Sequence, residues 1–173
     1  MNDVSIILPT RNKLEYLKQA YESIRVCSED IEIVILDDAS TDGTWLWLES
    51  LSLTDKNIIT YRSEEEERVG HTVLYDIGVK LCTKHIFSIF HADMVMSKNY
   101  IKNMLRYVKF KRVVSATRIE PPLHPPGPEK IVLDLGLEPE TFEANTFSKT
   151  VDEYEIQYRD KTTKGIFAPW MMY

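Results

Sequence analysis

The sequence is poor in the residues that several common motifs and structural classes require. Among its 173 residues are only two cysteines and six glycines, and no uncharged apolar run approaches the ~18 residues of a membrane-spanning helix. The glycines are too widely spaced for the G-x-G-x-x-G fingerprint of dinucleotide-binding folds, and the phosphate-binding P-loop pattern is absent. We therefore expect no disulfide framework, no transmembrane segment and no glycine-rich phosphate loop.

Positive charge is also scarce. Lysine and arginine number 21 against 27 aspartates and glutamates, which gives a formal net charge of −6. Nucleic acid is a poor candidate partner, because binding to its phosphates needs a broad basic surface. The chain enters an apolar strand pattern at Val4 without the features of a secretory signal, and two free cysteines suit a reducing compartment. We therefore expect a cytoplasmic protein.

Short β-like apolar runs alternate with longer stretches at helical spacing, a pattern typical of an α/β fold with a mostly parallel sheet. The pattern predicts strands at residues 4–8, 31–36, 57–61, 85–90 and 113–117. It predicts helices from Leu14 with Asn12 as cap, and over residues 45–51, 71–81 and 99–107.

The character of the chain changes after residue 117. Residues 121–128 contain five of the eight prolines and predict a loop, because proline cannot donate a backbone hydrogen bond. Residues 129–160 predict one short helix and a hairpin. The chain ends in an apolar run, from which we expect an incomplete, C-terminally truncated domain and association into a homo-oligomer. We therefore divide the chain into residues 1–117, an α/β core, and residues 118–173.

Polar residues follow three of the predicted strands. They are Thr10-Arg11-Asn12, Asp37-Asp38 and His91-Ala92-Asp93. In open α/β sheets, ligands bind beyond the carboxyl ends of the strands, so these residues are the candidates for a site. Without a glycine-rich loop, a divalent cation held by carboxylates is the expected means of binding phosphates.

Three segments together resemble the nucleotide-binding half of the family 2 glycosyltransferases, which have the GT-A fold. They are residues 4–12, residues 34–44 and residues 90–93, and the second, V-I-L-D-D-A-S-T-D-G-T, is the most specific. The resemblance implies a GT-A-like, Rossmann-like domain with a mostly parallel sheet flanked by helices. It also implies an inverting, metal-dependent glycosyltransferase that uses a nucleotide-sugar, a UDP-sugar, with Mn²⁺ or Mg²⁺. The saccharide or glycoconjugate acceptor is not identified by the sequence.

The resemblance assigns roles to individual residues. It implies that the nucleotide is bound by Pro9, Thr10, Arg11, Asn12, Asp37, Asp38, Gly70 and His91. The family's D-x-D motif reads His91-Ala92-Asp93 here, so Asp93 is the expected metal ligand. His91 replaces a carboxylate and can bind Mn²⁺ or donate to a ribose hydroxyl. Tyr75-Asp76 stands where the family has R-N, which is a second departure, and no catalytic base can be assigned.

These residues also have structural interpretations. The paired aspartates can end a strand, Ser40 or Asp42 can cap the next helix, and Asp93 can cap a helix near Ser97. His71 has no partner pattern in the sequence. Two other functions stay open: a nucleotide-binding module without transfer activity, and a sugar-phosphate nucleotidyltransferase. The loop after the first strand lacks the glycines that would support a nucleotidyltransferase.

Overall fold

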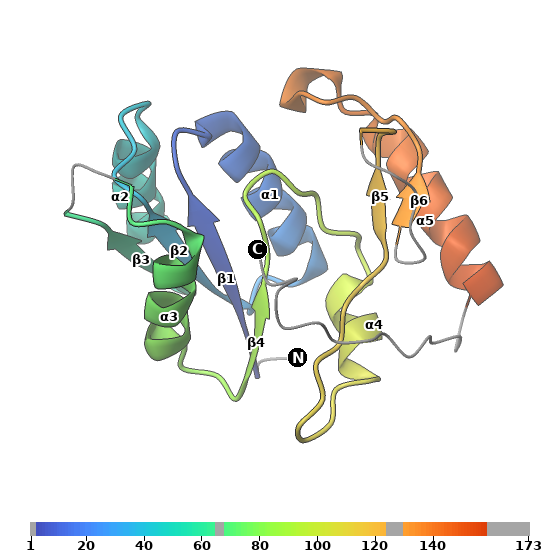
Figure 1. Ribbon diagram of the computed structural model, residues 1–173, viewed down its shortest axis with the longest axis horizontal. Coiled ribbons are helices and arrows are strands. Elements are labelled where there is room, and N and C mark those ends of the chain that lie inside the picture. The colour runs from blue at the N-terminus through green and yellow to red at the C-terminus, as the bar shows by residue number, and fades with distance from the viewer. Residues whose placement is uncertain (1–2, 65–67, 124–129, 159–173) are drawn as a thin grey trace. The chain divides into compact units, whose positions relative to one another are not determined.

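The computed structural model describes residues 3–64, 68–123 and 130–158. The chain divides into two compact units, residues 1–115 and residues 116–173, and each is described by itself. All the predicted binding residues lie in the first unit, whose elements are labelled in Figure 1.

The first unit is built on a four-stranded parallel sheet (Figure 1). Its strands are β1 (Val4–Thr10), β2 (Glu32–Asp37), β3 (Ile58–Arg62) and β4 (Ile86–Ile89). Their order in the sheet is β3-β2-β1-β4, and neighbouring strands in this sheet run parallel. β1 and β2 are buried along their whole lengths, which explains their nearly continuous apolar sequences. The predicted mostly parallel sheet is confirmed.

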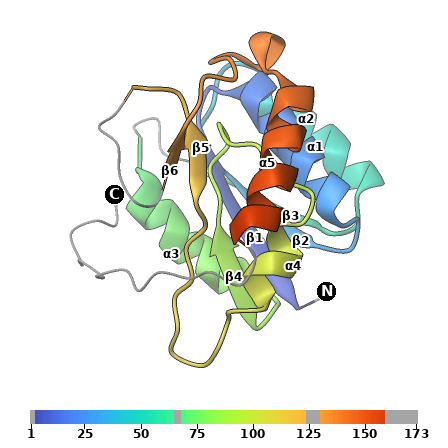
Figure 2. The same cartoon turned by 90° about the vertical axis from the view of Figure 1, so that its right-hand side faces the viewer.

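Helices cover both faces of this sheet. They are α1 (Leu14–Cys27), α2 (Thr44–Thr54), α3 (His71–Leu81) and α4 (Tyr100–Leu105). Figure 2 shows α1 and α2 on one face and α3 on the other. Because side chains alternate along a strand, Ile6 packs in one core cluster with Leu17 of α1, whereas Ile7 packs with Leu74 of α3. α3 lies close to the sheet because Gly78 has no side chain: a Cβ there would be 2.6 Å from Cγ2 of Ile7.

The second unit contains two short strands and a long helix. Its elements are β5 (Arg118–Glu120), β6 (Lys130–Val132), the 3-10 helix η1 (Pro139–Thr141) and α5 (Ala144–Tyr158). The hairpin predicted within residues 129–160 is wrong: among described residues 130–158 there is one strand, β6, and it pairs in parallel with β5, which lies before that range. Strands of three residues carry too little apolar alternation to indicate their direction. Residues 124–129 and 159–173 are outside the described residues. They include most of the proline-rich segment and the apolar end of the chain, so the expected truncation and self-association stay predictions.

Two strand predictions at the ends of the first unit also need correction. Residues 113–117 form no strand, and Val113 is 80% exposed. Pro9 does not end β1, which continues to Thr10. The carbonyl oxygen of Ile7 faces β4 and accepts the N–H of Phe90 at 2.9 Å. The nitrogen of Pro9, two residues further, faces the same side beyond the end of β4, so its missing N–H breaks no hydrogen bond.

Among the described residues, the longest helix is α5 with 15 residues, and none of the helices is both long enough and apolar enough to cross a bilayer.

The loops after β1 and β2 are joined by hydrogen bonds through their side chains. The N–H of Asn12 donates to Oγ of Ser40 at 2.9 Å, and the N–H of Thr41 donates to Oδ1 of Asn12 at 2.8 Å. Asn12 has a φ of 49°, a left-handed conformation that asparagine tolerates better than most residues. The S-T-D-G-T segment and the loop after β1 therefore form one rigid unit, which we call the loop clamp: residues 11–14 with residues 40–44.

Asp42 completes the loop clamp by serving two helices. Its Oδ2 accepts the N–H of Leu14 at 3.0 Å, and its Oδ1 accepts the N–H of Thr44 at 3.1 Å. The prediction that Asn12 caps α1 is wrong. The residue at the N-cap position is Lys13, which makes no side-chain cap, and the N–H of Leu14 donates instead to the carboxylate of Asp42 in the loop after β2. The prediction of Asp42 as a cap for α2 is confirmed.

Replacing Asp42 tests the loop clamp. We expect Asp42→Ala to lower the free energy of unfolding at neutral pH by about 1 kcal/mol, a typical value for a lost helix cap. We expect no larger loss because the side chain is exposed to solvent. Although burial raises it, hydrogen bonds from Thr44 and Leu14 hold the pKa of Asp42 below its ordinary value. A lowered pKa in the folded state gives stabilisation that is complete above the unfolded pKa of about 3.9 and is lost as the pH falls through the folded pKa.

Urea unfolding at a series of pH values measures this difference. The difference in the free energy of unfolding between wild type and Asp42→Ala should be constant above about pH 5 and should shrink as the pH falls below about 4. Asp30→Ala is the matched control, since Asp30 is also exposed but lies before the amino end of β2. A difference that grows on acidification would contradict the role of the Asp42 carboxylate.

Candidate functional site

The candidate site lies at the carboxyl edge of the four-stranded sheet. From β1 the chain adds β2 and β3 on one side and then returns to place β4 on the other side of β1. The carboxyl ends of β1 and β4 therefore flank the point where the strand order reverses, which is where open α/β sheets bind ligands. The three polar segments predicted from the sequence follow β1, β2 and β4, so the topology brings them to this one edge.

The predicted residues differ in their accessibility. Those with buried side chains are Pro9, Thr10, Asp37 and Asp38. Those that are half-buried or exposed are Arg11, Asn12, Gly70, His91 and Asp93. The half-buried and exposed residues can contact a ligand directly, whereas the buried residues support the edge from below.

Asp38 is 1% exposed and connects three segments of the edge. Its Oδ1 accepts a hydrogen bond from the N–H of Val69 at 3.0 Å. Its Oδ2 accepts a longer one, of 3.4 Å, from the N–H of Gly70, the residue directly before α3. Two guanidinium groups flank it: Arg11 Nη1 lies 3.8 Å from Oδ1, and Arg68 Nε lies 3.9 Å from Oδ2. Arg11 also donates to the carbonyl oxygen of Asp38 at 2.7 Å. The negative charge of Asp38 therefore holds both arginines and the first turn of α3 at the edge.

Thr10 and Asp37 are opposite each other in the β1–β2 register and share an unusual feature. Within the described part of the chain, Oγ1 of Thr10 and Oδ2 of Asp37 are buried and have no hydrogen-bond partner. Arg62 Nε lies 3.8 Å from Oδ2 of Asp37, too far for a hydrogen bond but close enough for an ion pair. A buried polar group without a partner costs about 1–3 kcal/mol, so a hydrogen-bond donor that reaches this position would be favoured.

Three aromatic rings meet where β4 ends and α3 begins. The ring centroids of His71 and His91 are 5.9 Å apart, those of His71 and Tyr75 are 6.0 Å apart, and those of Tyr75 and His91 are 6.4 Å apart. We call these three residues the ring cluster. Burial, and after it the charge of Asp93, raise the pKa of Tyr75.

The donor set at this edge fits a cation that also binds phosphate. Within the described residues, no three His, Cys, Asp or Glu side chains are placed to hold a metal ion by themselves. Mg²⁺ needs only one or two protein carboxylates when substrate phosphates supply the other oxygen atoms. The exposed carboxylate of Asp93 can serve in that way, and the imidazole of His91 suits Mn²⁺ better than Mg²⁺.

Sequence reasoning missed three of the groups at this edge. Arg62 ends β3, Arg68 precedes Gly70, and His71 begins α3. The sequence indicated them only by their positions at the end of a strand or the start of a helix. Such a position is weak evidence for a site unless it is known which loops lie close together. No catalytic base is identified among the described residues.

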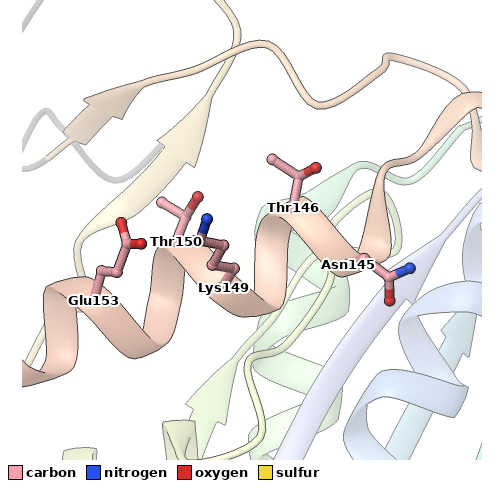
Figure 3. Close-up of a pocket in the computed structure, with 5 residues that line it drawn as sticks. All are labelled: Asn145, Thr146, Lys149, Thr150 and Glu153. Carbon is pink, nitrogen blue, oxygen red and sulfur yellow. The ribbon is translucent and has the colours of Figure 1, made fainter.

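A concave region lies along α5 in the second unit (Figure 3). It has a volume of about 370 Å³ and is lined by Asn145, Thr146, Lys149, Thr150 and Glu153. All five residues come from one helix, and none is a predicted site residue. The hollow therefore lacks the convergence of several elements that distinguishes the carboxyl edge of the sheet.

Comparison with known proteins places this geometry in a family. The chain is 30% identical over 118 residues to a dolichyl N-acetyl-alpha-D-glucosaminyl phosphate 3-beta-D-2,3-diacetamido-2,3-dideoxy-beta-D-glucuronosyltransferase of Methanococcus voltae, covering 65% of this chain and 36% of the relative. The mannosyltransferase PcManGT from Pyrobaculum calidifontis, in complex with GDP-Man and Mn²⁺, matches with a TM-score of 0.57 and 23% identity over 69% of this chain and 36% of that one.

S. aureus TarS in complex with UDP-GlcNAc matches with a TM-score of 0.54 and 21% identity, covering 60% of this chain and 30% of that one. These structural matches confirm the GT-A fold. The chain thus spans about a third of the Methanococcus voltae relative, of PcManGT and of the TarS segment 1–349, and 19% of the longer TarS chain. Residues 5–156 match the family described as Glycosyl transferase family 2. The chain therefore belongs to glycosyl transferase family 2.

Proposed function

We propose that this chain carries the donor site of a glycosyltransferase that transfers a sugar, with inversion, from a nucleotide-sugar to a saccharide or glycoconjugate acceptor. One observation carries the proposal: in a member of this family, the loops after β1, β2 and β4 converge at the point where the strand order reverses. A UDP-sugar is the proposed donor. Of the two structural relatives, one binds UDP-GlcNAc and the other GDP-Man, so both bases enter the tests below.

The proposed nucleotide site is the one predicted from the sequence. It consists of Pro9, Thr10, Arg11, Asn12, Asp37, Asp38, Gly70 and His91. The half-buried Arg11 and the more exposed Arg68 offer positive charge to the donor diphosphate, and Asp38 holds both in place. Thr10 and Asp37 lie buried below these groups, and their oxygen atoms without a partner would accept a hydrogen-bond donor that reaches them.

Asp93 is the proposed ligand of Mn²⁺ or Mg²⁺, a cofactor also present in the PcManGT complex. When bound, the cation would neutralise the negative charge that develops on the departing nucleoside diphosphate. The protein groups around it have other tasks. Asp93 lies exposed after β4, and the arginines beside Asp38 would bind and orient the phosphates.

Binding measurements with Asp93→Asn test the cation site. We expect Mn²⁺ to strengthen UDP or GDP binding to the wild type by at least about tenfold, because the ion joins the Asp93 carboxylate to the diphosphate. Asp93→Asn should lose this Mn²⁺ effect and should still bind the free nucleoside as weakly as the wild type does. Isothermal titration calorimetry with UDP, GDP, uridine and guanosine gives both quantities.

The control for this change is Asp30→Asn, which removes the same charge before the amino end of β2. It should keep the full Mn²⁺ effect. An undiminished Mn²⁺ effect in Asp93→Asn would show that the cation is held elsewhere.

The altered D-x-D motif, His91-Ala92-Asp93, favours one alternative: a module that binds the donor without transferring the sugar. Release of nucleoside diphosphate from UDP-sugars and GDP-sugars, with and without saccharide acceptors, distinguishes the two. For a transferase we expect acceptor-stimulated release at a rate of order 1 s⁻¹. Tight donor binding with no release above the rate without protein would instead show that these 173 residues bind the donor without transferring the sugar.

A further inference from the structure

The two departures from the family's sequence pattern meet in space. Tyr75 replaces the arginine of the R-N pair, and His91 replaces the first carboxylate of the D-x-D motif. The positions are 16 residues apart in the chain, on α3 and just after β4. The structure nevertheless places the two rings edge to face, with 6.4 Å between centroids and an angle of 86° between planes. Two residue types with the charges of the family pattern have thus been exchanged for two aromatic rings that contact each other.

His71 completes the arrangement from one helical turn before Tyr75. Its ring meets that of His91 at 5.9 Å and 71°, and that of Tyr75 at 6.0 Å and 40°. The His91 ring therefore has two aromatic neighbours, and both belong to α3. α3 is itself fixed, because Leu74 is fully buried against the sheet and Gly78 lets the helix approach Ile7 closely.

Contacts of this kind restrict a side chain before any ligand arrives. Aromatic pairs at these separations prefer edge-to-face geometry and hold each other in orientation. A half-buried imidazole that contacts two other rings has fewer conformations to lose when it forms a hydrogen bond to a ligand. One nitrogen of a neutral imidazole donates and the other accepts, which suits a hydroxyl group.

We propose that His71 and Tyr75 are positioning residues that hold the His91 imidazole for a hydrogen bond to the ribose hydroxyl groups of the donor nucleotide. This inference rests on the proposed function and assigns a task to two residues outside the predicted site. A carboxylate at position 91 would attract a ribose hydroxyl group by its charge. In this chain the contacts within the ring cluster restrict the His91 imidazole instead. Asp93 then remains the carboxylate of the motif for the cation.

A comparison of ribose-containing and ribose-modified nucleotides tests the proposal. The probes are UDP and GDP, each paired with its 2′,3′-dideoxy analogue, with Kd measured by calorimetry in the presence of Mg²⁺. We expect the wild type to prefer the ribose form by about fivefold to tenfold, the value of one good hydrogen bond to a ligand. Tyr75→Leu, which keeps an apolar side chain but removes the ring, should reduce this preference to less than about twofold.

Three further variants separate positioning from simple loss of structure. Tyr75→Phe keeps the ring and should keep the preference. Phe87→Leu makes the same kind of change at a ring earlier in β4 that is 48% exposed, and it should also keep the preference. In a His91→Ala background, Tyr75→Leu should have no further effect on the ribose preference, because Tyr75 acts through His91.

The side-chain NMR signals of His91 give a readout that needs no ligand. In the free protein, Tyr75→Leu should shift these signals, because the ring current of the tyrosine is removed, and Tyr75→Phe should leave them nearly in place. Unchanged His91 signals in Tyr75→Leu, or an unchanged ribose preference, would overturn the inference alone. If neither UDP nor GDP bound to the wild type, the proposed function would fail, and this inference would fail with it.

Discussion

The candidate site depends on the contacts that the buried carboxylate of Asp38 makes at the carboxyl edge of the sheet. The carboxylate accepts two N–H groups at the start of α3 and faces the guanidinium groups of Arg11 and Arg68, so it joins β2, α3 and the loop after β1. Without it, both half-buried N–H groups would lose their acceptor. A charge buried this deeply is tolerated because every side of it has a hydrogen bond or an opposite charge.

The same carboxylate explains how phosphates are expected to bind here. In many α/β folds a helix N-terminus at the sheet edge holds the phosphates of a nucleotide. At the start of α3 the carboxylate of Asp38 already occupies the N–H groups of Val69 and Gly70. These two N–H groups, which directly precede α3, are therefore not available to a phosphate, and in the proposed function side chains and a cation hold the donor diphosphate. Arg11, Arg68 and Asp93 are placed for that, which agrees with the lack of a glycine-rich loop in the sequence.

Local and strongly periodic features could be predicted from the sequence, whereas contacts between distant loops could not. The helix at residues 71–81 and the parallel sheet follow directly from apolar periodicity. The cap of α1 is supplied by Asp42, 28 residues away from Leu14, so no local pattern could indicate it. The ring cluster was missed for a similar reason. His71 and Tyr75 are one helical turn apart, but only the sheet order brings His91 beside them.

The central claim is that the donor binds at the carboxyl edge of this sheet, between the loops after β1, β2 and β4. The most direct test is a titration of the ¹⁵N-labelled chain with UDP and Mg²⁺, followed by ¹H–¹⁵N correlation spectra. The account predicts that the largest amide shifts fall on residues 10–12, 38–42, 68–71 and 91–93. Shifts confined to α5 and its hollow would contradict it.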